Sequence, residues 1–248
     1  MTAKDLTVFI GHDSKEPAAA AVLAHSILSR ASSPVYFMPL TKKATEKIYT
    51  RPRGPLEATE FSMTRFLVPY MSGYQGWSLF IDCDMLCLAD IWELMLYPLM
   101  DPGKAVYVCQ HDYTPKSAVK FDGHVQTAYP RKNWSSLMLF DNAKCKALTP
   151  EAVNTRSGMW LHRFSWLDEH ANMTDDGCAC MCDSINLIGS LPLEWNYLVG
   201  ESNQSTQPPK IYHYTNGTPC FEAYKNSEKA ELWHSELELM LHGAVVPV

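Results

Sequence analysis

Apolar and polar positions alternate along the chain in blocks that predict strands separated by helices. Residues 6–11 and 34–39 are short apolar runs rich in strand-forming residues, and residues 18–30 between them have the length and composition of a helix. Pro17 precedes this helix, at a position where helices tolerate proline. A strand–helix–strand unit is typical of an α/β sheet, which is the fold class that the start of the chain predicts.

The same pattern predicts the elements that follow. Thr59 is expected to cap a helix that ends at Pro69, and Gly158 is expected to interrupt a later helix. The sequence has no internal repeat, and we expect a single domain over residues 1–248. The expected strands lie at residues 105–109, 135–140 and 210–214, the helices at 59–69, 89–94, 150–167 and about 222–241, and the polar loops at 42–55 and 110–131.

An apolar run that ends in two carboxylates is the most informative stretch of the chain. Residues 77–81 are almost entirely apolar, as expected for a strand covered on both faces, and Asp82 and Asp84 follow with Cys83 between them. Two carboxylates at a strand end are costly unless a positive partner meets them. Magnesium and manganese bind through one or two carboxylates plus substrate phosphates, so the pair predicts a metal that holds a phosphorylated substrate. A solvated turn with two aspartates is the alternative.

Other polar side chains are candidates for the same site. Arg65 is the nearest cation before the aspartates, and its forked guanidinium suits a phosphate or carboxylate. Glu194 and Asn196 flank Trp195, a composition common in sugar pockets because rings pack on sugar C–H faces and polar groups bind hydroxyls. His213 is a candidate third metal ligand. The alternatives are structural: a surface arginine, a core tryptophan with polar neighbours, and a structural histidine.

Composition and charge narrow the function classes. The chain has 248 residues, of which 46% are hydrophobic and 19% charged, as in ordinary folded proteins. A net charge of -6 without any Lys/Arg run argues against a nucleic-acid binder. No Gly-x-Gly-x-x-Gly or Walker loop follows the first strand, which ends at Gly11. No transmembrane run and no secretory signal are present, so we expect a cytoplasmic protein.

The cysteines are expected to be free thiols, because a chain of this size without a secretory signal rarely has a disulfide framework. Residues 170–184 resemble an insertion and contain Cys178, Cys180 and Cys182. A soft metal such as zinc is one interpretation of this spacing. The spacing differs from the usual paired form, so a loop with reduced thiols is the favoured interpretation.

Several of these stretches, in this order, resemble the GT-A-fold glycosyltransferases, and most closely the retaining, glycogenin- and galactosyltransferase-like branch and its small bacterial relatives. They are residues 8–13, residues 61–69 with Arg65, residues 80–85 with the Asp-x-Asp, and Leu191-Pro192 with Trp195-Asn196 followed by His213 and Gly217. The resemblance extends from residue 8 to residue 221. It implies an α/β fold with a mixed, mostly parallel sheet flanked by helices.

The resemblance also implies roles for the candidate residues. Asp82, Asp84 and His213 would bind Mn²⁺ (or Mg²⁺), and the metal would hold a nucleoside diphosphate-sugar, for which UDP-sugar is the expected donor. Arg65 would lie near the diphosphate, and Glu194 would contact the acceptor or stabilise the oxocarbenium-like sugar. The other implied substrate-binding residues are Gly11, His12 and Asp13 near the nucleotide, Cys83 in the acidic motif, Asn133 and Ser135 near the sugar or acceptor, and Trp195, Asn196 and Gly217 in the late stretch.

The chain departs from this family at the late histidine and glycine. Three residues separate His213 from Gly217, where the family often has two. The family usually has a lysine on the diphosphate after this glycine, and residues 217–221 contain none. Stabilisation of the leaving group would then depend on the metal and Arg65, or on a lysine such as Lys225.

The predicted activity is metal-dependent transfer of a sugar to an acceptor hydroxyl, with retention implied by the resemblance. The acceptor is unknown and would be a glycan, a lipid-linked glycan or a small molecule. One alternative is an Asp-dependent phosphatase, whose motif is also an apolar strand followed by Asp-x-Asp, although Leu86 stands where Thr or Val is usual. The other is a non-catalytic nucleotide-sugar-binding protein, because the family lysine is missing.

Overall fold

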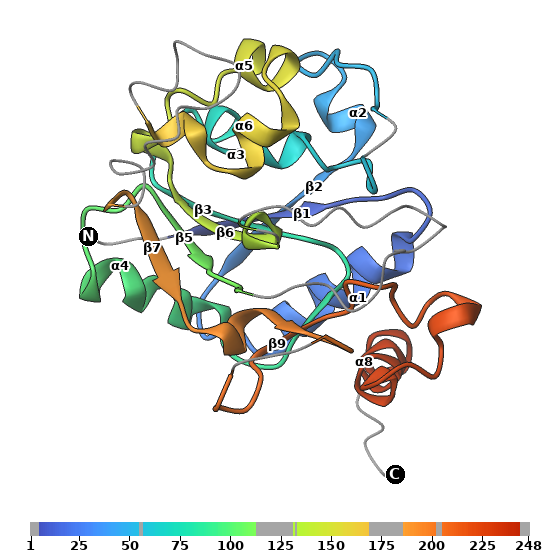
Figure 1. Ribbon diagram of the computed structural model, residues 1–248. Helices are drawn as coiled ribbons and strands as arrows, with labels where there is room; N and C mark the ends of the chain where they lie inside the picture. The colour runs from blue at the N-terminus through green and yellow to red at the C-terminus, as the bar shows by residue number, and fades with distance from the viewer. Residues whose placement is uncertain are drawn as a thin grey trace.

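A central sheet organises the computed structural model, which describes residues 5–54, 57–112, 131, 133–168, 186–201 and 205–243. The strand order is β2-β1-β3-β6-β5-β7 (Figure 1). Strand β6 runs antiparallel to both of its neighbours, and the remaining neighbouring pairs are parallel. This arrangement confirms the predicted mixed, mostly parallel sheet.

The strands and helices of the described ranges have the following bounds. The strands are β1 (Leu6–Gly11), β2 (Val35–Leu40), β3 (Trp77–Ile81), β4 (Met85–Cys87), β5 (Val106–Cys109), β6 (Leu137–Asp141), β7 (Ile188–Leu191), β8 (Tyr197–Leu198) and β9 (Ile211–His213). The α-helices are α1 (Pro17–Leu28), α2 (Lys42–Thr45), α3 (Val68–Met71), α4 (Tyr97–Met100), α5 (Pro150–Thr155), α6 (Gly158–His162) and α8 (Ala230–His242). The 3₁₀ helices are η1 (Thr64–Leu67), η2 (Ile91–Leu96), η4 (Trp134–Ser136), η5 (Asn142–Lys144), η6 (Ser165–Leu167), η8 (Leu193–Asn196) and η9 (Glu222–Tyr224).

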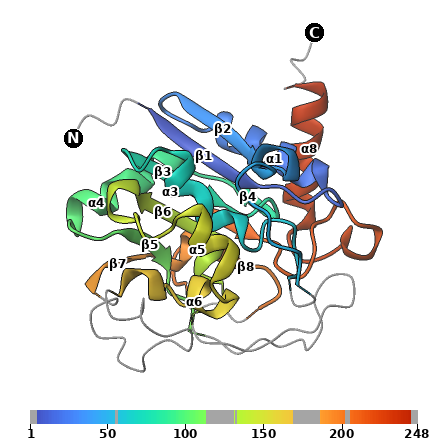
Figure 2. The same ribbon diagram turned by 90° about the horizontal axis from the view of Figure 1, so that it is seen from above.

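Helices cover both faces of the sheet, which explains why its central strands are apolar at nearly every position. Figure 1 shows α3, α5 and α6 above the sheet and α1 and α4 below it, and Figure 2 shows the upper layer from above. Leu79, Phe80 and Ile81 of β3 are each 0% exposed. A strand buried on both faces needs apolar side chains on both, so the sequence of β3 follows from its central place in the sheet.

A second, smaller sheet has the strand order β4-β9-β8, and its buried Leu86 and Tyr212 form one apolar cluster with Val22 of α1 and Trp233 of α8. Strand β4 begins directly after the two aspartates and pairs antiparallel with β9, so that Met85 lies opposite His213. This short pairing brings a late segment of the chain to the carboxyl end of β3.

The predicted helix at residues 59–69 is divided in the structure. Residues 59–63 form turns, η1 follows, and α3 begins at Val68. Pro69 lies in the first turn of α3 instead of ending a helix, because the first turn does not use the N–H that proline lacks. The expected interruption near Gly158 is confirmed, since Gly158 is the first residue of α6.

Two other expectations about helices were wrong. The C-terminal helix begins at Ala230 and not near residue 222, since Lys229 before it has a left-handed backbone with φ of 62°. The predicted loop at residues 42–55 contains the short helix α2, which Thr41 caps by accepting the N–H of Ala44 at 3.0 Å.

The insertion at residues 170–184 and most of the predicted loop at 110–131 lie outside the described residues. No helix in the described ranges combines the length and the apolar character that a membrane span requires.

Candidate active site

Asp82, Asp84 and His213 come together at the carboxyl end of β3. One ligand atom from each residue lies within 4.8 Å of the others. Nε2 of His213 is 3.3 Å from Oδ1 of Asp84, and the backbone N–H of Tyr214 donates to the carbonyl of Asp84 at 2.8 Å. The pairing of β4 with β9 is the cause, since it sets His213 opposite Met85, the residue after Asp84. The structure thus brings together the three residues that were predicted as metal ligands.

A hydrogen-bonded chain orients the His213 ring. Nδ1 of His213 lies 2.9 Å from Oδ1 of Asn196, whose Nδ2 donates to the hydroxyl of Ser136 at 2.8 Å and to the carbonyl of Asn133 at 3.4 Å. A carbonyl can only accept, so the amide nitrogen of Asn196 faces Asn133 and its oxygen faces His213. Nδ1 of His213 therefore carries a hydrogen, and Nε2 is the nitrogen turned toward Asp84.

This donor set suits a divalent cation. Carboxylate oxygens are the ligands that magnesium and manganese prefer, and imidazole nitrogen is a common ligand of transition metals. Two carboxylates and an imidazole acceptor so close together are stabilised by a positive charge. The Asp-Asp-His cluster could therefore bind a divalent metal ion.

Arg65 lies beside the cluster and is almost fully buried. Its Nη1 is 3.0 Å from Oδ1 of Asp82 and donates to the carbonyl of Ser135 at 2.8 Å. Its guanidinium lies 5.2 Å from the ring centroid of Phe61 and 5.0 Å from that of Phe80. The rings and the ion pair fix the guanidinium, so Arg65 holds the Asp82 carboxylate in one orientation.

The loop after β1 approaches the same region. Gly11 ends β1 against the ring of Phe61, and a Cβ on Gly11 would lie 2.5 Å from that ring, so only glycine fits. Asp13 is buried and accepts the N–H of Lys15 and the N–H of Glu60, each at 3.0 Å. These bonds shape the loop. The predicted contacts of Gly11, Asp13 and the partly exposed His12 with the nucleotide stay predictions.

Glu16 lies near Asp84 and was not selected from the sequence, because its place before Pro17 marks only the start of a helix. The Thr218 hydroxyl donates to Oε2 of Glu16 at 2.8 Å, and the Cys83 thiol donates to Oε1 at 3.7 Å. Burial, followed by the nearby charge of Asp84, raises the pKa of Glu16 to about 8. Burial also raises the pKa of the Cys83 thiol well above its usual range. The Cys83 thiol is therefore neutral at neutral pH, and its surroundings favour the neutral form of Glu16 as well.

Two histidines that were not selected from the sequence also border the site. Nδ1 of His162 lies 2.8 Å from the hydroxyl of Ser135, and the carbonyl of His111 accepts the indole N–H of Trp134 at 2.9 Å. Burial, followed by the charge of Arg65, lowers the pKa of His162 to about 3. Burial, followed by His213, lowers the pKa of His111 to about 3. These two histidines belong to no sequence motif, so their place beside the site could be found only from the structure.

The remaining late candidates lie in different surroundings. Trp195 is 0% exposed in the core, and the ammonium of Lys210 lies 4.7 Å from its ring centroid. Glu194 is partly exposed, and its carbonyl accepts the N–H of Lys210 at 2.7 Å. Gly217 has φ of 146°, and a Cβ there would lie 2.4 Å from the ring of Tyr224. Lys225, the substitute considered for the missing lysine, pairs with Glu222.

The chain is similar to a plant protein over nearly its whole length. It is 46% identical over 244 residues to Protein CDI of Arabidopsis thaliana, an alignment that covers 95% of this chain and 87% of that protein. No protein-family model matches the chain.

Solved structures with the same fold are glycosyltransferases. The bifunctional glycosyltransferase WbbM has a TM-score of 0.58 at 16% identity, over 96% of this chain and 50% of WbbM. GlyE of Streptococcus pneumoniae TIGR4 has a TM-score of 0.53 at 14% identity, over 96% of this chain and 62% of GlyE. The galactosyltransferase LgtC, in complex with donor and acceptor sugar analogues, has a TM-score of 0.51 at 11% identity. The match covers 93% of this chain and 95% of LgtC. The expected GT-A fold is confirmed, and the chain spans half the length of WbbM.

Proposed function

Because the chain belongs to the family of Protein CDI of Arabidopsis thaliana and has the GT-A fold, we propose that it transfers a sugar from a nucleoside diphosphate-sugar to an acceptor hydroxyl. The proposed donor is a UDP-sugar, the proposed cofactor is Mn²⁺ or Mg²⁺, and the proposed outcome is retention of the anomeric configuration. LgtC was solved with donor and acceptor sugar analogues, which supports two sugar subsites in this chain as well.

The observation that carries this proposal is the Asp82, Asp84 and His213 cluster within 4.8 Å at the carboxyl end of β3. Ligands of open α/β sheets bind beyond the carboxyl ends of the strands. A donor set of this kind at that place, in this fold, is what a metal-bound diphosphate requires.

We propose a distinct task for each neighbouring side chain. Asp82, Asp84 and Nε2 of His213 would hold the metal, and Arg65 would keep Asp82 oriented and add positive charge beside the diphosphate. The chemistry that a bound divalent ion supplies at such a site is neutralisation of the charge that builds on the departing diphosphate. The partly exposed Glu194 would face the acceptor or the oxocarbenium-like sugar.

The test is thermal unfolding of the protein with a panel of nucleoside diphosphate-sugars, each with and without Mn²⁺. A ligand that binds only the native state adds about 2.7 kcal/mol of stability at a hundredfold excess over its dissociation constant. We expect a rise in melting temperature that requires both a UDP-sugar and the metal. The absence of a shift with every nucleotide would contradict the proposal.

A turnover assay separates the alternatives. Transfer of the sugar, or slow hydrolysis of the donor in the absence of an acceptor, is expected of a glycosyltransferase. Release of phosphate from a sugar phosphate without any acceptor would instead indicate the Asp-dependent phosphatase. Donor binding with neither transfer nor hydrolysis, across a broad acceptor panel, would indicate a non-catalytic binding protein.

A further inference from the structure

Arg163, directly after α6, has a charge that nothing in the described ranges neutralises. Its Nε is buried and has no hydrogen-bond partner, and no Asp or Glu of the described ranges forms an ion pair with its guanidinium. The side chain as a whole is partly exposed. An anion that reaches the exposed part of this guanidinium would stabilise its charge.

Arg131 is held next to Arg163. Its Nη1 donates to the carbonyl of Arg163, and its guanidinium lies 5.4 Å from the ring centroid of Trp134. Its backbone is left-handed, with φ of 63°, which is a strained conformation for arginine. Burial, together with the charge of Arg163, holds the pKa of Arg131 below its ordinary value. The fold thus keeps two like charges close together in a chain of net charge -6.

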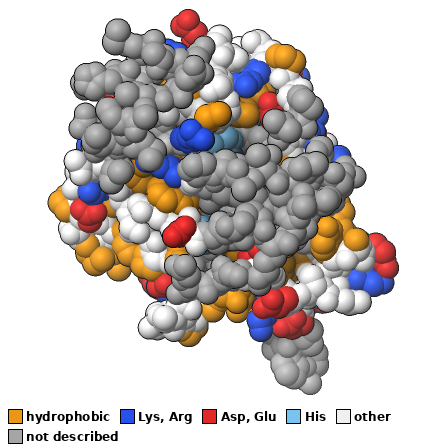
Figure 3. Space-filling view, in the orientation of Figure 1, with side chains coloured by type: hydrophobic (Ala, Val, Ile, Leu, Met, Phe, Trp, Pro, Cys, Tyr) orange, Lys and Arg blue, Asp and Glu red, His pale blue; other side chains and the backbone are white. Residues whose placement is uncertain are grey.

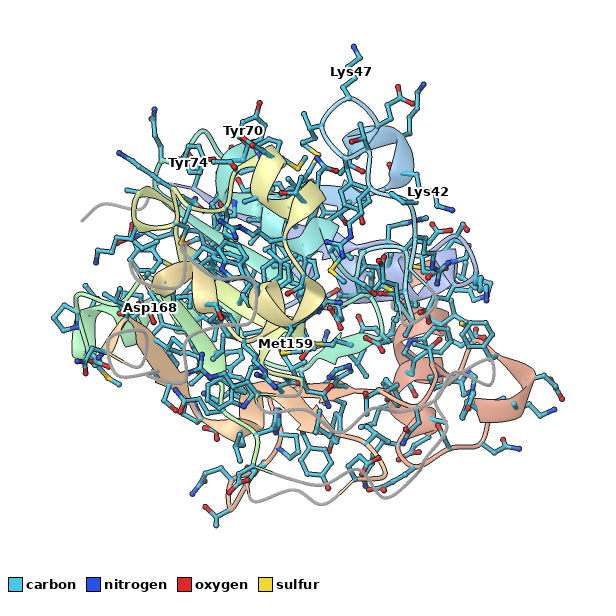
Figure 4. All side chains as sticks on the ribbon, turned by 45° about the horizontal axis from the view of Figure 1, so that its top comes forward. Lys42, Lys47, Tyr70, Tyr74, Met159 and Asp168 are labelled. Carbon is cyan, nitrogen blue, oxygen red and sulfur yellow. The ribbon has the colours of Figure 1, made fainter. Side chains whose placement is uncertain are left out.

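This arginine pair borders the candidate active site. Trp134, under Arg131, is followed by Ser135, whose carbonyl accepts from Arg65 at 2.8 Å. On the side of α6, His162 precedes Arg163 and lies 2.8 Å from the Ser135 hydroxyl. Figure 3 shows Lys and Arg side chains beside a histidine on this face of the molecule, and Met159 marks α6 in Figure 4.

We propose that Arg131 and Arg163 form an anion subsite that binds a phosphate group of the acceptor, so that the acceptor substrate is a phosphorylated hydroxyl compound. The proposal rests on the proposed transferase function. Two guanidinium groups match the charge of a phosphate, about -1.5 to -2, better than that of a single carboxylate. The diphosphate of the donor already has Arg65 and the Asp-Asp-His cluster as its proposed partners, which leaves the arginine pair for the other substrate.

The experiment measures binding of inorganic phosphate by calorimetry at constant ionic strength, without metal or nucleotide. The variant is Arg163→Gln, and the matched control is Lys47→Gln, because Lys47 is an exposed cation that points away from the molecule (Figure 4). We expect Arg163→Gln to weaken phosphate binding about tenfold, since it removes charge-assisted hydrogen bonds. Lys47→Gln should leave it unchanged. Absence of phosphate binding by the wild-type protein, or equal binding by Arg163→Gln, would overturn the subsite.

A second arm separates the acceptor from the donor. Binding of UDP with Mn²⁺ should be the same in Arg163→Gln and in the wild-type protein. An equal loss of UDP and phosphate binding would assign the arginine pair to the donor diphosphate and overturn the acceptor assignment. Failure of the wild-type protein to bind UDP with Mn²⁺ would count against the proposed function alone, because phosphate binding is measured without either.

A charge-conserving variant covers the case in which Arg163→Gln does not fold. Arg163→Lys keeps the charge but loses the planar fork, so we expect phosphate binding to weaken a few-fold and to persist. Unchanged phosphate binding by a folded Arg163→Lys would contradict a forked contact with the anion.

Discussion

Hydrogen bonds between buried side chains set the geometry of the candidate active site. Asn196 was selected as a sugar-binding group, yet it is 0% exposed and joins His213 to the Asn133–Ser136 turn. The acidic motif could be found from the sequence because a buried strand that ends in two carboxylates is unusual. The role of Asn196 could not, since an amide beside a tryptophan looks the same whether it meets a sugar or a histidine.

Asn196→Ala is expected to weaken Mn²⁺ binding about 10- to 100-fold, because Nδ1 of His213 loses the acceptor that fixes its tautomer. Calorimetric titration of the nucleotide-free protein with Mn²⁺ measures this effect directly. The control is Asn154→Ala, which removes another amide with several backbone partners, on α5 and not at the end of β3. Asn154→Ala should lower stability without changing metal affinity. Equal metal affinity in Asn196→Ala and the wild type would refute this orienting role.

Asp84→Asn is expected to reduce sugar transfer to nearly nothing while the protein stays folded. The substitution keeps the size of the side chain and removes the charge that a divalent ion requires. Transfer from a UDP-sugar with Mn²⁺ and the far-ultraviolet circular dichroism spectrum are the two measurements. Normal turnover by a folded Asp84→Asn protein would exclude Asp84 as a metal ligand.

Elements with long apolar runs could be predicted from the sequence, and short or tertiary-dependent ones could not. Strands β1, β2, β3 and β5 lie within one residue of the predicted positions, because their sequences are mainly apolar. Burial on both faces forces this composition on β1, β3 and β5, whereas the edge strand β2 has exposed Tyr36 and Met38. Strand β9 was expected, but its antiparallel pairing with β4 was not, since strands this short carry no pattern that specifies a partner. That pairing creates the metal-ligand cluster, so the element that matters most for the site was the least predictable.

Helix α8 packs on α1 through a buried carboxylate that meets a histidine and an arginine. Oε1 of Glu236 lies 2.6 Å from Nδ1 of His25, and Oε2 lies 2.8 Å from Arg30, while the Glu236 side chain is only 3% exposed. Glu236→Gln is expected to lower the free energy of unfolding by about 1–3 kcal/mol, less than for a fully buried pair because both partners are partly exposed. Urea unfolding at neutral pH is the measurement.

The control for this contact is Glu238→Gln on the same helix. Glu238 pairs with His242 across one helical turn, and both side chains are largely exposed. Its substitution should change stability by less than about 0.5 kcal/mol. If both variants lose equal stability, the ion pairs of Glu236 do not hold α8 against α1.

Stability of the whole molecule should have a maximum near pH 6.5. The pKa of Glu16 rises from 4.5 to about 8, so its stabilisation is complete below about pH 4.5 and is lost as the pH rises through 8. The pKa values of His111 and His162 fall from 6.5 to about 3, so stability is also lost as the pH falls below 6.5. Between these limits the two histidines outweigh the one carboxyl, which places the maximum near the ordinary histidine pKa.

Urea unfolding between pH 5 and 8.5, in the presence of a chelator, tests this profile. Above pH 6.5 the free energy of unfolding should fall by at most about 1.4 kcal/mol per pH unit. Glu16→Gln should reduce this fall, because the amide keeps the acceptor for Thr218 and cannot ionise. Stability that increases steadily from pH 6.5 to 8 in the wild-type protein would show that Glu16 is ionised in the native state.

The antiparallel pairing of β4 with β9 also determines when the site can exist during synthesis. Asp84 and His213 are about 130 residues apart, so a ribosome makes both aspartates long before the histidine. A nascent chain that already contains β1, β3 and β6 has the acidic strand end but lacks the strand that supplies the third ligand. Tight metal binding would begin only once β9 has emerged and paired, so the growing polypeptide would stay insensitive to the cation for most of its translation.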